Sequence, residues 1–113
     1  MATADHRSTE VLEQLAILLE QRKGAEAGSS YVASLYQKGR AKIAQKVGEE
    51  GVEVALAAVG DDRDELINEM ADLWFHSLVL LADANLTPAD VLSELERRFG
   101  LSGLEEKARR AQD

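Results

Sequence analysis

The sequence contains no cysteine, only one proline, and aromatic residues at just 4% of its 113 positions. Without cysteine, a disulfide scaffold, a thiolate metal site and a cysteine nucleophile are all excluded. No hydrophobic run approaches the roughly 20 residues that a membrane-spanning helix requires. The first eight residues are polar and lack the hydrophobic segment of a secretory signal. We therefore expect a cytoplasmic protein.

Basic residues are also scarce, because 13 Lys and Arg stand against 21 Asp and Glu, giving a formal net charge of -8. Binding to nucleic acid depends on clustered Lys and Arg that contact phosphates. An anionic membrane surface attracts the same residues. We therefore expect neither nucleic acid nor a membrane as a partner. The length leaves room for one domain, 1–113.

The abundant residues are helix formers, and the alternation typical of strands is absent. This composition predicts an all-α fold, a bundle of about five helices with its core in residues 9–99 and its centre in an antiparallel helix pair. We expect a further short helix from Ser102 and a tail, 105–113, that frays. The five helices are expected from Ser8 or Thr9 to Gly24, from Tyr31 to Lys38, from Arg40 to Val59, from Asp62 to Ala84 and from Thr87 to Phe99.

The two longest of these helices are apolar over most of their circumference, and each carries one narrow line of carboxylates. At about 100° per residue, the acids of helix 40–59 share a stripe about 100° wide with two lysines, and those of helix 62–84 span about 60° with a histidine. The first line is Lys42, Lys46, Glu49, Glu50 and Glu53, and the second is Glu65, Glu69, Asp72 and His76.

These lines have two interpretations. Each could be the solvated face of an amphipathic helix, although such a face normally mixes Lys with Glu at i,i+4 spacing. Alternatively, a turn at Gly60-Asp61 lets the two lines face each other across a cleft. Carboxylates are seldom buried unless they are paired or bound to metal. Clustered carboxylate oxygens suit Mg²⁺, which can bridge them to the phosphates of a substrate.

Two groups of cationic or titratable residues accompany the acids. Lys38, Lys42 and Lys46 are spaced by four and lead along helix 40–59 towards the glutamates, with Arg40 nearby. They could receive phosphate oxygens, or they could be an ordinary solvated lysine face. His76 could be a metal ligand, a base or a phosphate contact, or a core histidine whose nitrogens are satisfied within the protein.

Three segments of the chain closely resemble the phosphoribosyl-ATP pyrophosphohydrolase family, over roughly Val11 to Leu95. They are SYVASL (30–35), KIAQKVGEEGVE (42–53) and EMADLWFH (69–76). The EExxE and ExxD patterns within them are similar to those of the wider MazG-like all-α nucleoside triphosphate pyrophosphatases. One departure is Gly51, where such sequences usually have alanine, and we interpret it as a packing variation at a close helix crossing.

The resemblance implies hydrolysis of phosphoribosyl-ATP to phosphoribosyl-AMP and pyrophosphate, the second step of histidine biosynthesis. It also implies a homodimer or dimer of dimers, and a Mg²⁺ cofactor that Mn²⁺ can replace. Glu50 and Glu53 are then the candidate catalytic residues. The candidate metal ligands are Glu49, Glu50, Glu53, Glu69 and Asp72, and the candidate phosphate contacts are Lys38, Arg40, Lys42, Lys46 and His76.

Two other functions stay open from the sequence. The first is a housecleaning pyrophosphatase of the same superfamily that acts on dUTP, dCTP or damaged nucleotides. The second is a helical dimerisation module without enzymatic activity. Two helices that are apolar on most sides have few other helices to cover them, which favours a twofold partner. The candidate contact residues, each of which fits a monomer core equally well, are Trp74, Phe75, Leu78, Leu81 and Leu86.

Overall fold

The structure, a computed structural model, describes residues 2–100, and within that range it contains helices and no strand. The predicted all-α class is therefore confirmed. The predicted helix at Ser102 and the tail 105–113 lie outside the described residues. The elements are α1 (Ala2–Gln21), η1 (Arg22–Gly24), η2 (Ala27–Ser29), α2 (Tyr31–Lys38), α3 (Arg40–Val59), α4 (Arg63–Asp83) and α5 (Pro88–Phe99).

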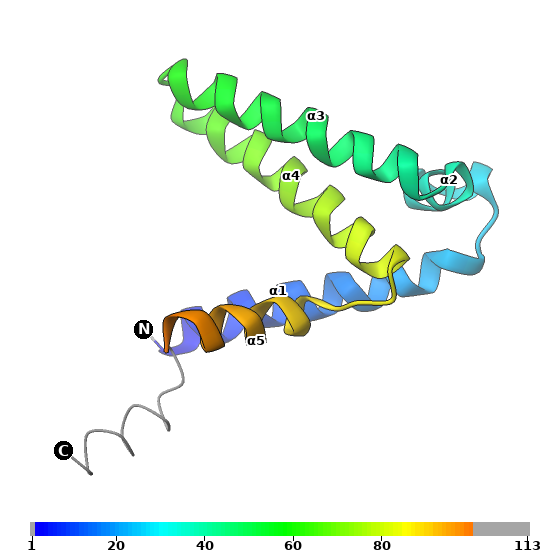
Figure 1. The fold of residues 1–113 in the computed structure, drawn as a ribbon, viewed down its shortest axis with the longest axis horizontal. Coiled ribbons are helices and arrows are strands. Elements are labelled where there is room, and N and C mark those ends of the chain that lie inside the picture. The colour runs from blue at the N-terminus through cyan, green and yellow to red at the C-terminus, as the bar shows by residue number, and fades with distance from the viewer. Residues whose placement is uncertain (1, 101–113) are drawn as a thin grey trace, which may run out of the picture.

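The dominant feature is an antiparallel hairpin of α3 and α4 (Figure 1). The short α2 packs at the beginning of α3, and α1 contacts both α4 and α5. As Figure 1 shows, α1 and α5 lie side by side below the hairpin, and the closed end of the hairpin points away from them. None of the described helices is both long and apolar enough to cross a membrane.

Local chemistry fixes most helix ends where the sequence predicted them. Ser30 and Asp62 each accept a hydrogen bond from the backbone N–H three residues later, at 3.0 and 3.2 Å, and so cap α2 and α4. Thr87 and Asp90 form a reciprocal capping box at the start of α5, with Pro88 as its first helical residue. These side chains satisfy N–H groups that the first turn of a helix leaves without partners.

The two tight connections around α4 each use a residue with positive φ. Asp61 (φ 61°) lies between α3 and α4, and Asn85 (φ 61°) follows the end of α4. Asp and Asn tolerate this left-handed conformation better than other side chains because they form local hydrogen bonds. The turn at Gly60-Asp61 is therefore short enough to place α3 directly against α4.

Two expectations about helices differ from the structure. Helix α1 begins at Ala2 rather than at Ser8 or Thr9, and η1 replaces its predicted last turn before Gly24. Ser and Thr inside a helix cost only about 0.5 kcal/mol each relative to Ala, which is too little to stop it. A Cβ on Gly51 would meet no atom within 4 Å, so the predicted close crossing is absent from the described chain.

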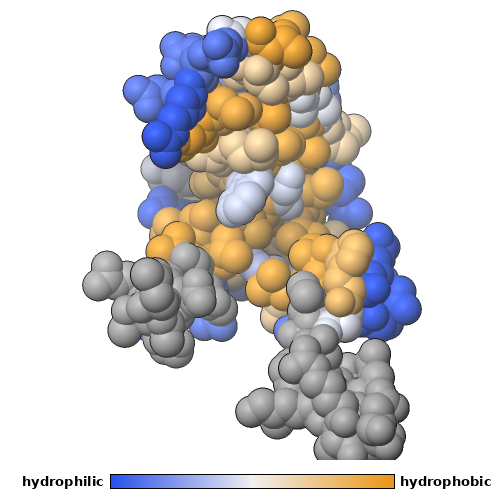
Figure 2. Space-filling view, turned by 90° about the vertical axis from the view of Figure 1, so that its left-hand side faces the viewer, coloured by the Kyte–Doolittle hydropathy of each residue, from blue (hydrophilic) through white to orange (hydrophobic). Residues whose placement is uncertain are grey.

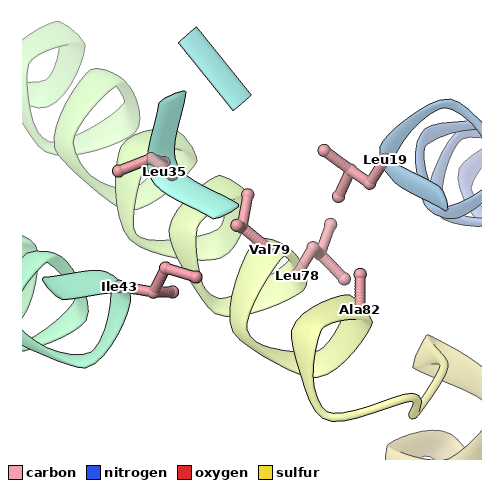
Figure 3. Close-up of a cluster of buried hydrophobic side chains, with 6 residues drawn as sticks. All are labelled: Leu19, Leu35, Ile43, Leu78, Val79 and Ala82. Carbon is pink, nitrogen blue, oxygen red and sulfur yellow. The ribbon is translucent and has the colours of Figure 1, made fainter. Parts of the chain in front are cut away.

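The hydrophobic core lies at the open end of the hairpin, where four helices meet (Figure 3). Its most deeply buried side chains come one from each of these helices. The core ties α1 and α2 to one half of the hairpin and leaves the other half free for a site. These four side chains are Leu19 of α1, Leu35 of α2, Ile43 of α3 and Val79 of α4.

Replacing Leu19 by Ala should lower the free energy of unfolding by about 2–5 kcal/mol, because Leu19 is fully buried and its removal leaves a cavity between α1 and α4. Urea unfolding followed by circular dichroism measures this change. A loss below about 1 kcal/mol would contradict the assignment of Leu19 to the core.

Candidate active site

Three carboxylates meet between α3 and α4 near the middle of the hairpin, beyond the core at its open end. Glu50 of α3 and Glu69 and Asp72 of α4 each offer an oxygen, and the three oxygens lie within 4.8 Å of one another. Glu50 and Glu69 are half-buried, and Asp72 is exposed. The antiparallel pairing produces this meeting, because Glu50 lies ten residues before Gly60 and Glu69 and Asp72 lie a similar distance after it.

Of the three glutamates on α3, Glu50 is the one whose carboxylate meets the α4 acids, although it lies at the edge of the predicted stripe. Its side chain is 14% exposed, compared with 51% for Glu49. Glu49 instead accepts a hydrogen bond from Gln45 at 2.9 Å and lies 3.6 Å from the Lys46 ammonium. The Gln45 hydrogen bond, followed by the Lys46 charge, lowers the pKa of Glu49. Glu49 is thus an ionised surface carboxylate beside the cluster, and its charge is stabilised by Gln45 and Lys46.

Glu69 is at the electrostatic centre of the site. Its pKa is raised, first by desolvation and then by the negative charges around it. Glu53 lies outside the set of three converging oxygens, yet it contributes the largest of these charge effects. The surrounding acids repel the ionised form of Glu69 in the absence of a counter-cation. They are, in order of effect, Glu53, Asp72, Glu50 and Glu65.

Of the predicted lysines, Lys46 lies nearest to the acids, with its ammonium 4.0 Å from a Glu50 oxygen. Lys42, one turn earlier on α3, is half-buried and acts electrostatically on Glu49. Lys38 does not continue this line, which corrects the prediction. It is the last residue of α2, and Gly39 breaks the helix with φ 97° and ψ 172°. The i,i+4 spacing aligns side chains only within one continuous helix.

Arg40 contacts Asp83 at the end of α4 and not the acids of the site. Its guanidinium pairs with the Asp83 carboxylate and also donates to the Asp83 carbonyl oxygen at 3.2 Å. This contact closes the open end of the hairpin, about 15 Å along α3 from Glu50. The predicted role of Arg40 as a phosphate contact therefore receives no support from the structure.

His76 lies one helical turn after Asp72 on α4 and is buried, with 6% of its surface exposed. Its Nδ1 lies 2.8 Å from the carbonyl oxygen of Asp72, and its Nε2 lies 2.8 Å from the hydroxyl of Tyr31. Both ring nitrogens thus have partners within the protein, as in the core-histidine alternative. Sequence reasoning missed Tyr31 as part of the site, although the SYVASL segment that contains it was one signal of the resemblance.

The donor set fits a hard divalent cation. Every converging ligand atom is a carboxylate oxygen, and such oxygens with room for water are what Mg²⁺ prefers. The raised pKa of Glu69 supports the same conclusion, because a bound cation would relieve the repulsion that causes part of this shift. Glu50, Glu69 and Asp72 can therefore hold a metal ion, with Glu53 beside them.

Fold and site together define an all-α protein with an acidic site between two antiparallel helices. Residues 12–99 match the family described as phosphoribosyl-ATP pyrophosphohydrolase. The chain belongs to this family, a family of hydrolases, which confirms the resemblance seen in the sequence. It is similar to a phosphoribosyl-ATP pyrophosphatase of Methylococcus capsulatus, with 55% identity over 101 residues, which are 89% of this chain and 96% of that protein.

Replacing Glu69 by Gln should raise the melting temperature at neutral pH in EDTA. Folding raises the pKa of Glu69, so its ionised form destabilises the folded state at a pH above this raised value, and the amide removes that penalty. Below the ordinary carboxyl pKa, Glu69 is protonated in both states and the gain should vanish. Thermal melts at pH 7.5 and pH 3.5 measure the difference.

Glu49→Gln is the matched control for this substitution. Folding lowers the pKa of Glu49, so its charge stabilises the folded state at neutral pH, and its loss should leave the melting temperature unchanged or lower it. An equal rise for both variants would attribute the effect to net charge and not to the cluster around Glu69.

Proposed function

We propose that this protein hydrolyses phosphoribosyl-ATP to phosphoribosyl-AMP and pyrophosphate, the second step of histidine biosynthesis, in the cytoplasm. The family match over residues 12–99 supports this substrate. The observation that carries the chemistry is the meeting of Glu50, Glu69 and Asp72 next to Lys46. A triphosphate and a group of bare carboxylates repel each other, so this pairing of site and substrate requires cations between them.

We infer that Mg²⁺ is the cofactor and that Mn²⁺ can replace it. Glu50, Glu69 and Asp72 would hold it, with Glu53 as a further ligand and Glu49, turned towards Gln45 and Lys46, as the most peripheral member of the predicted set. When bound, the metal neutralises and polarises phosphoryl oxygens and lowers the pKa of a coordinated water.

The chain's own residues then accept a proton and balance the charge of the leaving group. Glu50 is half-buried on the inner face of α3, and we propose that it takes the proton from the attacking water as the α–β phosphoanhydride bond breaks. Glu53, at the edge of the cluster, adds to the negative charge that acts on Glu69 and is the second candidate for this step. Lys46 and Lys42 are suited to balance the charge that develops on the departing pyrophosphate.

Replacing Glu50 by Gln should lower kcat/KM for phosphoribosyl-ATP about 100-fold or more, because it removes both a metal ligand and the proposed base. Pyrophosphate release at saturating Mg²⁺ measures this, with circular dichroism to confirm the helical fold. Glu96→Gln, an exposed glutamate on α5, is the matched control and should retain full activity.

The same assay separates the alternative functions. Phosphoribosyl-ATP should be turned over in preference to dUTP, dCTP and oxidised nucleotides. Preference for one of those would indicate a housecleaning pyrophosphatase. Absence of metal-dependent turnover of any nucleotide, with no effect of Mg²⁺ or Mn²⁺ on thermal stability, would favour a non-enzymatic module.

We also propose that the protein is a homodimer or a dimer of dimers. The outer half of the α3–α4 hairpin leaves large hydrophobic side chains exposed, and hydrophobic residues cover much of the face seen from the closed end of the hairpin (Figure 2). Such surface on a small chain indicates a partner. The exposed fractions are 58% for Val52, 60% for Leu56, 82% for Val59 and 54% for Ile67.

A second apolar surface lies in a groove of about 490 Å³ between α1, α4 and α5. Trp74 lines this groove and is 59% exposed. Leu86, two residues before Pro88 of the same groove, is 46% exposed. Of the other candidate contacts, Leu78 is buried in the core of the chain, and Phe75 and Leu81 pack against that core. Trp74 and Leu86 are therefore the candidates that a partner would cover.

The fluorescence of Trp74, the single tryptophan, should report this assembly. We expect blue-shifted emission at micromolar concentration, because the partner covers the exposed indole, and a red shift on dilution below the dissociation constant. Sedimentation velocity at the same concentrations gives the mass. A monomeric mass at every concentration would contradict the proposed dimer.

A further inference from the structure

Two hydrogen bonds in series connect the start of α2 to the α4 backbone at the acid cluster. The hydroxyl of Tyr31 lies 2.8 Å from Nε2 of His76, and Nδ1 of His76 lies 2.8 Å from the carbonyl oxygen of Asp72. Asp72 is one of the three residues whose carboxylates converge. The Tyr31–His76 bond spans 45 positions of sequence and is a tertiary contact, whereas the His76–Asp72 bond lies within α4.

The Asp72 carbonyl fixes the direction of one bond, and in the neutral ring this also sets the direction of the other. A carbonyl oxygen only accepts, so Nδ1 of His76 must carry a proton and donate it to the Asp72 carbonyl. In the neutral ring this leaves Nε2 as the acceptor of the Tyr31 hydroxyl proton. The ring therefore has no free nitrogen for a metal ion or a phosphate. Its Nε2 joins α4 to α2, and its Nδ1 bonds within α4 to the backbone one turn earlier.

Both ends of this connection are themselves held in place. Tyr31 is the first residue of α2, directly after the Ser30 cap, and Ser34 donates a hydrogen bond to the Tyr31 carbonyl oxygen at 2.6 Å. Leu35, four residues later, is 2% exposed in the core. The His76 ring is 6% exposed and stacks edge-on with the Tyr31 ring, with centroids 5.7 Å apart.

The cluster needs such a restraint for an electrostatic reason. Glu50 lies on α3 while Glu69 and Asp72 lie on α4, so their mutual repulsion acts to rotate or separate the two helices. The core that joins α3 and α4 lies at the open end of the hairpin, whereas the acids lie near its middle. If α4 changed its register against α3 by one residue, the Asp72 side chain would rotate by about 100° around the helix axis and its carboxylate would leave the cluster.

We infer that Tyr31, acting through His76, is a positioning residue that holds the α4 backbone at Asp72 so that its carboxylate stays beside Glu50 and Glu69 before a cation binds. This role rests on the proposed function, because it assumes that the carboxylates bind a divalent cation. It also explains the arrangement of the SYVASL segment. Ser30 caps α2 and Leu35 anchors α2 in the core, so that the Tyr31 hydroxyl is held against His76 of α4.

Tyr31→Phe tests this inference because it removes only the hydroxyl. Tyr36→Phe is the matched control on the same helix. The Tyr36 hydroxyl donates to the Leu19 carbonyl oxygen at 2.9 Å, and burial, followed by the charges of Glu20 and Asp83, raises its pKa to about 12, so it stays protonated. Both variants lose one tertiary hydrogen bond of α2, but only Tyr31→Phe interrupts the connection to Asp72.

The primary measurement is Mn²⁺ binding to the full chain, followed by electron paramagnetic resonance of the free ion. We expect Tyr31→Phe to raise the Mn²⁺ dissociation constant about 10-fold, the lower end of the effect of losing an outer-shell contact, and Tyr36→Phe to change it less than twofold. Saturating Mn²⁺ should restore most of the kcat of Tyr31→Phe, because the catalytic groups remain.

The outcomes separate the two proposals. Wild-type protein that binds no Mn²⁺ overturns the proposed function and this inference with it. Wild-type binding with an unchanged dissociation constant in Tyr31→Phe overturns the positioning role alone. Equal weakening in both tyrosine variants also overturns it, since the effect would then follow from the general stability of α2. Weakening confined to Tyr31→Phe supports it.

Discussion

Repulsion between carboxylates on two helices that are packed together is the constraint on which the rest of this structure depends. Glu50 meets Glu69 and Asp72 across the α3–α4 hairpin, and Glu69 feels this charge through its raised pKa. Like charges at this separation favour the opening of the hairpin. The fold must therefore supply enough attraction elsewhere to keep the helices in register.

The hairpin divides these tasks along its length. Its open end carries the hydrophobic core, with Ile43 and Val79 fully buried, and is closed by the Arg40–Asp83 ion pair. Its middle carries the acids, and its far half carries exposed hydrophobic side chains such as Val59. Stability and chemistry are thus separated in space, which lets the chain place an unfavourable cluster of charges without disrupting its core.

The sequence predicted local features well because short-range chemistry decides them. Ser30, Asp62 and Thr87 each begin a helix in the structure, since a side-chain oxygen near the N-terminus satisfies backbone N–H groups regardless of the rest of the fold. The start of α1 was wrong for a related reason: Ser8 and Thr9 resemble caps but fit inside a helix at small cost.

By itself, the sequence determined the all-α class, the family and the presence of two acidic lines, because the helical repeat fixes the relative angles of side chains on one helix. Only the tertiary structure decided that Glu50, and not Glu49, faces α4, and that Tyr31 reaches His76. The physical reason is that periodicity leaves the rotation of each helix against its neighbour undetermined. Packing around the buried core sets that rotation, and with it which carboxylates meet.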